Sequence, residues 1–365
     1  MPEPLVDEGR AGLAQLAAKW GLTWDNLMRA RSDAEAERRR LSERIGSARL
    51  VTGDTGFVVF GSLARGEWTA GSDVDWALLI DGPADDAHLT STHEIRRILK
   101  DLGYKEPGRE GFFGGLSVSH ELVHRIGGNF DSNRNITQRI LLLLESDSPL
   151  PNDLVRARVL RVLLSRYLSD DFGYPVPGPA DARVPRFLLN DIVRYWRTMA
   201  VDFAAKRRER AGKGWGLRNF KLRLSRKLTF TAGLAACLSC KLRPPMRPGS
   251  PATETETDYA SVMAEHLLSF TNSTPLDTLA WLALEFEAGA DVVRDIMDSY
   301  DAYLEIVADE SKRKRLENLG PEESNRDSLF AETRDIGDRF QKGLTGLFLD
   351  TNDDLRVVTQ RYGVF

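Results

Sequence analysis

The stretch from Phe60 to Ile80, FGSLARGEWTAGSDVDWALLI, constrains the fold of this chain more than any other feature. Two carboxylates, Asp73 and Asp75, stand two residues apart at the head of an apolar run that predicts a buried strand. Side chains alternate along a strand, so both carboxylates are expected on one face, where like charges repel. A divalent cation removes that repulsion, and Mg²⁺ prefers oxygen ligands together with water and substrate phosphates. The pair therefore predicts a metal site that meets a nucleotide.

The residues just upstream suit a triphosphate. Gly61 follows the short apolar strand FVVF, and a glycine there lets the backbone approach a phosphate closely. Ser62 offers a hydroxyl and an N–H at a predicted helix start, where anions bind well. Arg65 adds a positive charge. Together these residues predict a phosphate-binding turn beside the aspartate pair.

The motif G-S-x-x-R-G followed by S-D-x-D resembles the nucleotidyltransferase fold of the DNA polymerase β-like superfamily. The resemblance is strongest over residues 57–82. Within the superfamily, the chain is most similar to the GlnD-type nucleotidyltransferases of bacteria, in which a helical region also follows the catalytic domain. It is carried by Gly61, Ser62, Arg65, Gly66, Ser72, Asp73 and Asp75. The HD-type metal motif of the full-length uridylyltransferases is not visible, so their hydrolytic activity is not implied.

The resemblance implies transfer of a nucleoside monophosphate from an NTP, with ATP favoured, to a hydroxyl, with release of pyrophosphate. Asp73 and Asp75 would hold two Mg²⁺ or Mn²⁺ ions, and a third carboxylate would complete the site that activates the hydroxyl. The triphosphate would be held on one side by Gly61, Ser62, Arg65 and Ser72.

The third carboxylate has two alternatives in the sequence. Glu121 lies in LSVSHELVHRIG, whose partial alternation favours a strand that could run beside the aspartates, although it could turn into a short helix. Asp131 lies in GGNFDSNRN, which favours a loop. An acid on a strand is held more rigidly, so Glu121 is the preferred catalytic and metal-binding residue. The alternative is that Glu121 is an ordinary surface residue.

The same stretch contains HELVH, which matches the zinc-hydrolase pattern H-E-x-x-H. That chemistry requires a helix, because on a strand His120 and His124 would lie roughly 13 Å apart and could not share an ion. The position six residues after the second histidine, where a third is often found, is Phe130. The predicted strand therefore argues against a zinc site.

A basic block follows. Residues 183–247 hold 17 Lys and Arg against 3 Asp and Glu, a net charge of +14 in a chain whose total is −4. Within the expected helix RNFKLRLSRKL, Lys221 and Ser225 are spaced i, i+4, and Arg218 lies three residues before Lys221. In related nucleotidyltransferases a lysine and a serine of the helical domain bind the β- and γ-phosphates. These three residues are predicted to do so here, although a solvated charged face would show the same pattern.

The overall pattern predicts an α+β fold. A nucleotidyltransferase domain with a small mixed sheet and flanking helices is expected at residues 1–150, and an all-helical domain that closes the nucleotide cleft at residues 151–365. Helices are expected at 8–45, 91–104 and 135–146, and strands at 57–60 and 74–80. A Pro-rich linker at 174–185 and a loop at 242–257 interrupt the helical half. The CxxC pair, Cys237 and Cys240, is expected to be buried.

Composition excludes several classes of function. The sequence starts with no secretory signal and has no apolar run that could cross a bilayer, so a cytoplasmic protein without a membrane partner is expected. No zinc-finger, RRM or KH signature and no DNA signature is present, which leaves a protein side chain, a nucleotide or RNA end, or a small molecule as acceptor. A bacterial signalling, regulatory or defence role stays open. The alternative is a weakly active or inactive nucleotide- or RNA-binding scaffold of the same fold.

Overall fold

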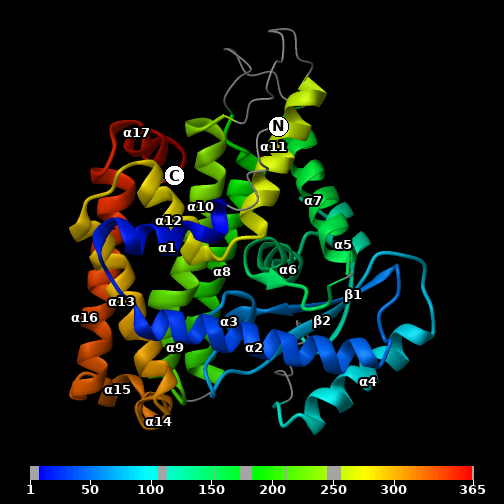
Figure 1. Ribbon diagram of the computed structural model, residues 1–365, viewed down its shortest axis with the longest axis horizontal. Coiled ribbons are helices and arrows are strands. Elements are labelled where there is room, and N and C mark those ends of the chain that lie inside the picture. Colours follow the sequence, from blue (N-terminus) through cyan, green and yellow to red (C-terminus); the bar gives the residue numbers. More distant parts are fainter. Residues whose placement is uncertain are drawn as a thin grey trace.

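The computed structural model describes residues 8–105, 113–151, 153–172, 183–209, 212–244 and 256–363. Its architecture is α+β, as predicted, with a small sheet in the N-terminal part and helices elsewhere (Figure 1). The predicted Pro-rich linker and the predicted loop at 242–257 fall largely outside the described residues.

The sheet is mixed and has the strand order β3-β2-β1-β4. Its strands are β1 (Thr55–Phe60), β2 (Asp75–Ile80), β3 (Gly115–Val118) and β4 (Ser146–Asp147). β1 pairs antiparallel with both β2 and β4, whereas β2 pairs parallel with β3. Phe60 lies opposite Asp75 on one side and opposite Ser146 on the other, so the end of β1 forms the centre of this sheet edge.

Alternation along β1 and β2 sends apolar side chains to both faces of the sheet. Phe57, Val59, Trp76 and Leu78 pack with helices α2 (Asp25–Ser47) and α4 (Ala87–Asp101) in one buried cluster. Val58 and its neighbours on the other face join a larger cluster that extends through the helical half. A sheet covered on both faces explains the nearly continuous apolar sequence of both strands.

The other regular elements of the described chain are helices, which are joined by turns and loops. Those of the first half, besides α2 and α4, are α1 (Glu8–Trp20), α3 (Gly61–Ala64), α5 (Ser119–His124), α6 (Asn133–Leu144) and α7 (Val155–Phe172). Gly21, with φ of 60°, separates α1 from α2, as the sequence suggested. The helices predicted at 8–45, 91–104 and 135–146 and the strands predicted at 57–60 and 74–80 are present with shifted ends, whereas the strand predicted through Glu121 stops at Val118.

The second half is helical throughout its described residues. In order it contains α8 (Arg186–Glu209), α9 (Trp215–Lys221), the π-helix η1 (Leu222–Arg226), α10 (Lys227–Leu242), α11 (Glu256–Thr271), α12 (Pro275–Glu285), α13 (Ala290–Ala308), α14 (Glu310–Asn318), α15 (Pro321–Ser324), α16 (Ser328–Thr345), the π-helix η2 (Gly346–Asp350) and α17 (Asp353–Tyr362). Cys237 and Cys240 are buried and unbridged on α10. Within the described ranges, no helix combines the length and apolarity that crossing a membrane requires.

The two halves share one hydrophobic core. α1 packs on α12, and α2 packs on α13, so the first helices of the chain lie against helices near its end (Figure 1). Trp24 Nε1 donates to Asp298 (2.9 Å), and the backbone N–H of Leu27 donates to Asp301 (2.9 Å). The first helices of the α/β half are therefore packed against the helical half, while the predicted division at residue 150 stays a prediction.

Candidate active site

The turn from β1 into α3 lies directly beside Asp75. Gly61 has φ of 66°, a conformation that favours glycine, and a Cβ at this position would stand 3.1 Å from Asp75 Oδ2. Both the backbone conformation and the space therefore require glycine. Ser62, next in the chain and half-buried, is the second residue of the short helix α3, which begins at Gly61. The structure thus brings Gly61 and Ser62 to Asp75.

The two aspartates do not share a strand, so that part of the prediction is wrong. β2 begins at Asp75, because its partner β1 ends opposite at Phe60. Asp73 lies in the preceding turn, where its side chain is 56% exposed and Lys105 Nζ lies 3.9 Å away. Asp73 nevertheless lies close enough to Asp75 for its charge to affect the pKa of that carboxyl.

Ser72, predicted to contact the nucleotide, stabilises this turn. Its Oγ accepts from the backbone N–H of Thr69 (3.1 Å), and its own N–H donates to the Thr69 carbonyl (2.9 Å). The residue therefore positions Asp73 rather than presenting a free hydroxyl.

The carboxyl of Asp75 titrates abnormally. Burial is the main cause that raises its pKa from 3.8 to about 6; the charges of Glu145 and Asp73 also raise it, and Arg226 is the largest opposing influence. A buried carboxylate with other acids nearby is costly to ionise, and a bound cation would offset that cost. The Asp75 environment is therefore one in which a metal ion or a cationic group would be stabilised.

Arg65 does not face a nucleotide. Its side chain is buried and forms ion pairs with Glu67 (2.8 Å) and Glu145 (2.7 Å). Glu67 in turn accepts from the hydroxyl of Tyr300 on α13 (2.8 Å). Because its guanidinium is enclosed by two carboxylates, Arg65 links the turn after α3 to the helical half instead of binding phosphate in this arrangement.

Glu145 is the centre of this buried cluster, and no local sequence pattern predicted its role. It accepts from Arg65, from Arg226 (2.9 Å) and from Thr229 (2.9 Å). Burial alone would raise the pKa of Glu145, but the two guanidinium charges and the Thr229 hydroxyl outweigh burial and lower it. Glu145 is therefore ionised and holds Arg226 next to Asp75.

The π-helix η1 changes which side chains face the aspartates. Ser225, expected beside Lys221, is 2% exposed, and its hydroxyl donates back to the Lys221 carbonyl (3.2 Å). A π-helix has a wider turn, so residues five apart come closer to one face than they do in an α-helix. Arg226 accordingly lies near Lys221, whose pKa its charge lowers. Ser225 is therefore buried beside Lys221, whereas Arg226, five residues on, is the neighbour whose charge affects Lys221.

Lys221 of the helical half is influenced by the charges of both aspartates. Its side chain is solvent-accessible but crowded by neighbouring groups. This desolvation and the charge of Arg226 lower its pKa, while Asp73 and Asp75 both act to raise it. Because the charges of both carboxylates affect its pKa, Lys221 lies within electrostatic reach of them.

Arg218, which was predicted to contact the nucleotide, is directed back along its own helix. It donates to the carbonyls of Gly214 (3.1 Å) and Lys213 (2.8 Å) at the start of α9.

Glu121 lies on α5 and not on a strand, so its predicted position is wrong. β3 ends at Val118, opposite the last residue of β2, so the chain has no further partner strand and turns into helix. Ser119 Oγ donates to Asp81 (2.7 Å), which follows β2. Since β2 spans roughly 17 Å, α5 lies at the far end of the sheet from Asp75. Glu121 is exposed there and pairs with Arg125 (3.2 Å).

The strand next to β2 carries no carboxylate over its described length. β3 pairs with β2 only from Gly115, opposite Ala77, to Val118, opposite Ile80. Gly114, with φ of 79°, ends the extended conformation before β3, and the Phe113 ring packs on Phe60 with ring centroids 5.3 Å apart. Within the described residues, β3 therefore supplies no third acid beside Asp75.

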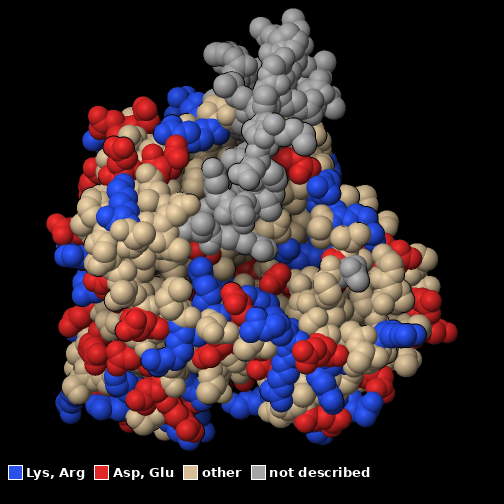
Figure 2. Space-filling model, in the orientation of Figure 1, with Lys and Arg blue, Asp and Glu red and all other residues tan. Residues whose placement is uncertain are grey.

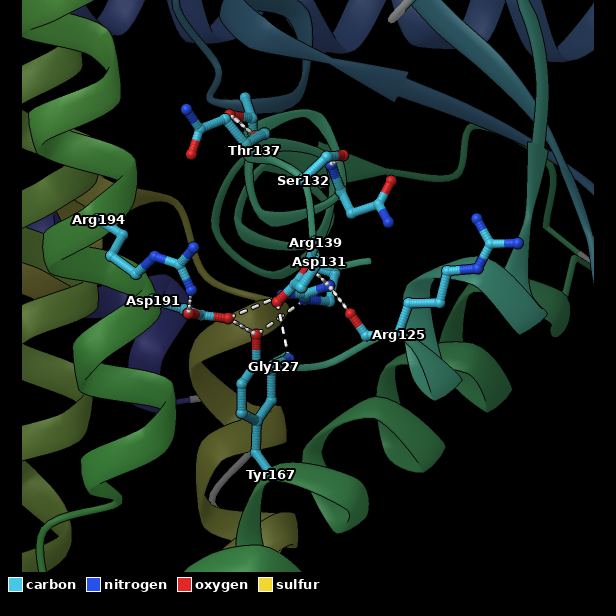
Figure 3. Close-up of polar contacts among 11 residues, drawn as sticks. Arg125, Gly127, Asp131, Ser132, Thr137, Arg139, Tyr167, Asp191 and Arg194 are labelled. Carbon is cyan, nitrogen blue, oxygen red and sulfur yellow. Dashed lines mark hydrogen bonds and ion pairs between the residues drawn. The ribbon is translucent and has the colours of Figure 1, made fainter. Parts of the chain in front are cut away.

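Asp131, the alternative third acid, belongs to a separate buried network (Figure 3). Both of its oxygens accept from Arg139 (2.9 and 2.7 Å), and Oδ2 also accepts from the backbone N–H of Gly127 (2.8 Å). Arg139 is fully buried and also donates to Asp191 (2.8 Å) and Tyr167 (2.9 Å). This network ties α6 to α7 and α8, so Asp131 has a structural position.

The HELVH stretch is helical, which overturns the geometric argument against a shared metal. The His120 and His124 rings lie on one face of α5 with centroids 5.0 Å apart. Among the residues that the structure describes, no third His, Cys, Asp or Glu joins them in a metal-binding group. The ligand set of a zinc hydrolase is thus not assembled by the described part of the chain.

Asp73 and Asp75 fit a divalent cation in chemistry, because both supply carboxylate oxygens and burial, together with the charges of Glu145 and Asp73, raises the pKa of Asp75. No cluster of three protein ligands forms there within the described ranges. The remaining ligands would then be water and phosphate oxygens, as is usual for Mg²⁺ bound together with a nucleotide.

A strand, a glycine turn and a short helix that lie beside Asp75 at the start of the next strand of a mixed sheet are the arrangement expected of a nucleotidyltransferase fold. Residues 38–108 match the family model described as a nucleotidyltransferase domain, a stretch that includes both aspartates and the glycine turn. No curated protein sequence matches the chain significantly. The chain thus carries a domain of the nucleotidyltransferase superfamily, which supports an NTP as substrate and nucleoside monophosphate transfer as the general activity.

Proposed function

We propose that the protein is a Mg²⁺-dependent nucleotidyltransferase whose nucleotide lies between the sheet edge and η1. The observation that supports the proposal is that opposite charges of the two halves lie within electrostatic reach of one another. Asp73 and Asp75 belong to the sheet edge, and Lys221 and Arg226, from the helical half, influence or are influenced by their charges. Cations and carboxylates gathered in this way suit a metal-bound triphosphate.

Each residue then has a role. Asp73 and Asp75 hold two Mg²⁺ or Mn²⁺ ions, which when bound would lower the pKa of the attacking hydroxyl and offset charge on the leaving pyrophosphate. Gly61 and Ser62 present backbone to the phosphates from the turn before α3. Lys221 and Arg226 bind the outer phosphate oxygens. Glu145 acts as a positioning residue, because its ion pair holds Arg226 at the site.

The proposal names a favoured NTP and only the chemical classes of the acceptor. ATP is favoured on the resemblance to GlnD-type enzymes. The acceptor is a hydroxyl of a protein side chain, of a nucleotide or RNA end, or of a small molecule, in a bacterial signalling, regulatory or defence setting.

A second function is favoured by one specific observation. Among the described residues, β3 carries no carboxylate beside β2, Phe113 just before it packs on Phe60, and Glu121 lies at the other end of the sheet. A site with two acids could bind metal and NTP yet turn over slowly. The protein would then serve as a nucleotide- or RNA-binding regulatory scaffold.

Labelled NTPs distinguish the two functions. The purified protein would be incubated with each α-labelled NTP, Mg²⁺ or Mn²⁺, and pools of protein, RNA and small-molecule acceptors. The transferase predicts pyrophosphate release and a product that mass spectrometry finds heavier by one nucleotide, both lost in the Asp73→Asn/Asp75→Asn double variant. Metal-dependent binding without product in any pool would support the scaffold.

A further inference from the structure

Two histidines of the HELVH stretch form an exposed pair on α5. His120 and His124 are four residues apart, so both side chains lie on one face of the helix, and their ring centroids are 5.0 Å apart. Both residues are exposed. Among the residues that the structure describes, neither ring takes part in a hydrogen bond or an ion pair. The ring nitrogens are therefore available to a ligand from solution.

The separation of the two rings fits a single metal ion. A zinc–nitrogen bond is about 2.0 Å long, and the centre of an imidazole ring lies about 1.1 Å behind its nitrogen, so each ring centre stands about 3.1 Å from a bound ion. Two ring centres 5.0 Å apart then subtend an angle of about 105° at the ion. Zn²⁺ in proteins prefers tetrahedral coordination, whose angle is about 109°. The pair thus has the spacing of two ligands of one tetrahedral ion.

The charges around α5 are compatible with a bound cation. Arg125 pairs with Glu121 (3.2 Å), and Arg158 pairs with Asp81, so each of these guanidiniums is offset by a carboxylate. Burial would raise the pKa of Asp81, but hydrogen bonds from its neighbours and the charges of Arg158 and His120 lower it. His120 therefore lies within electrostatic reach of a carboxylate, which would stabilise a positive ion at the pair.

The pair differs from the aspartate site in both chemistry and position. Imidazole nitrogens suit Zn²⁺, Cu²⁺ and Ni²⁺, whereas carboxylate oxygens suit Mg²⁺. α5 packs on α6 and α7 at the end of the sheet remote from Asp75 (Figure 1). Figure 2 shows acidic and basic side chains interspersed over the described part of one face, so individual ligands rather than a broad field would select a metal there. Two ions of different type could therefore bind without competing.

We propose that His120 and His124 form a second metal site, which chelates one divalent transition-metal ion of the Zn²⁺ class. The described part of the chain supplies no third ligand, so water or a donor atom of a bound molecule fills the remaining positions. The ion joins two successive turns of α5, a helix of only six residues, and so stabilises it in helical form. The proposal does not depend on nucleotidyl transfer, because neither histidine is assigned to that reaction.

Isothermal titration of the full chain with Zn²⁺ tests the site, after a chelator has removed bound metal and with an excess of Mg²⁺ present. Saturable binding of one ion at the pair is expected, and Cu²⁺ should bind more tightly than Zn²⁺. His120→Gln and His124→Gln should each weaken Zn²⁺ binding about a hundredfold, because a single imidazole loses the advantage of a tethered second ligand. His93→Gln, which removes an exposed histidine of α4, is the matched control and should bind as the wild type does.

Three results would overturn the assignment. The first is the absence of saturable Zn²⁺ binding in the wild type. The second is binding that survives both histidine variants but is lost in Asp73→Asn/Asp75→Asn, since Zn²⁺ would then occupy the carboxylates. The third is a loss in His93→Gln as large as that in His120→Gln, which would mean that surface histidines bind singly. Zn²⁺ binding that persists in the double aspartate variant supports the pair whether or not the protein transfers nucleotides.

Discussion

At the scale of single residues, the site depends on how Asp75 is enclosed. It lies at the first position of β2, against Gly61 and near two other acids, and its pKa is raised to about 6. The residue that opposes this shift most strongly is Arg226. The ionised form of Asp75 is therefore destabilised in the metal-free protein, and a bound cation would stabilise it.

Asp75→Asn should make the metal-free protein more stable at pH 7. The folded-state pKa of about 6 exceeds the ordinary 3.8, so the folded state binds this proton more tightly than the unfolded chain does. Stability is then lost as pH rises from about 4 to 6, by up to about 3 kcal/mol. Thermal melts of wild type and variant across this pH range would show the gap opening with pH. If the difference in melting temperature between wild type and variant were the same at pH 4 and at pH 7, the raised pKa of Asp75 would be refuted.

The same pKa predicts how nucleotide binding depends on pH. Protonated Asp75 cannot ligate a cation, so metal-dependent NTP affinity should fall as pH drops through about 6. Fluorescence titration with Mg²⁺ and ATP from pH 5 to pH 8 measures this. Affinity that stays constant through pH 6 would show that Asp75 takes no part.

At the scale of elements, the π-helical geometry of η1 determines which side chains approach the two aspartates. Lys221→Ala and Arg226→Ala should each raise the NTP dissociation constant about tenfold to a hundredfold, through loss of a charged hydrogen bond. Ser225→Ala should leave it nearly unchanged, because that hydroxyl is buried and bonded to backbone. Equilibrium dialysis with labelled NTP would rank the three. A Ser225 effect larger than that of Arg226 would mean that the α-helical register applies in the complex.

Local sequence predicted the strand–turn–helix around Gly61 correctly, because glycine conformation and strand alternation act over a few residues. It placed Ser225 wrongly, since an i, i+4 argument assumes an α-helix and η1 is a π-helix. It placed Glu121 on a strand because Leu116, Val118 and Leu122 alternate, but β2 ends where β3 does and pairing stops. A helix there depends on the length of a neighbouring strand, which the local pattern does not contain.

Two substitutions test the corrected positions of the acids. Glu121→Gln should change turnover by less than about twofold, because exposed side chains away from a site usually matter little. Asp131→Asn should instead lower the free energy of unfolding by roughly 2–3 kcal/mol, because Arg139 is fully buried and would lose a charged partner. Chemical denaturation and turnover assays separate the effects. A large loss of turnover in Glu121→Gln would restore the strand-based prediction.

At the scale of the whole molecule, buried ion pairs join segments far apart in the sequence. Glu145 connects Arg65 of the first half to Arg226 of the second, and Arg139 connects α6 to α8. The sequence shows an excess of positive charge in residues 183–247 but not which arginines are paired internally. That is why Arg65 and Arg218 looked like phosphate ligands and Arg226 did not. Partners 80 residues apart are set by tertiary packing.

The most direct test of the central claim is the dissociation constant of Mg²⁺-bound ATP for four proteins. These are the wild type, Asp73→Asn/Asp75→Asn, Arg226→Ala and the control Arg39→Gln, each checked for folding by its thermal melt. A nucleotide held between the sheet edge and η1 predicts loss of metal-dependent binding in the double variant, binding weakened about tenfold or more in Arg226→Ala, and wild-type binding in the control. Wild-type affinity in both site variants would contradict the account.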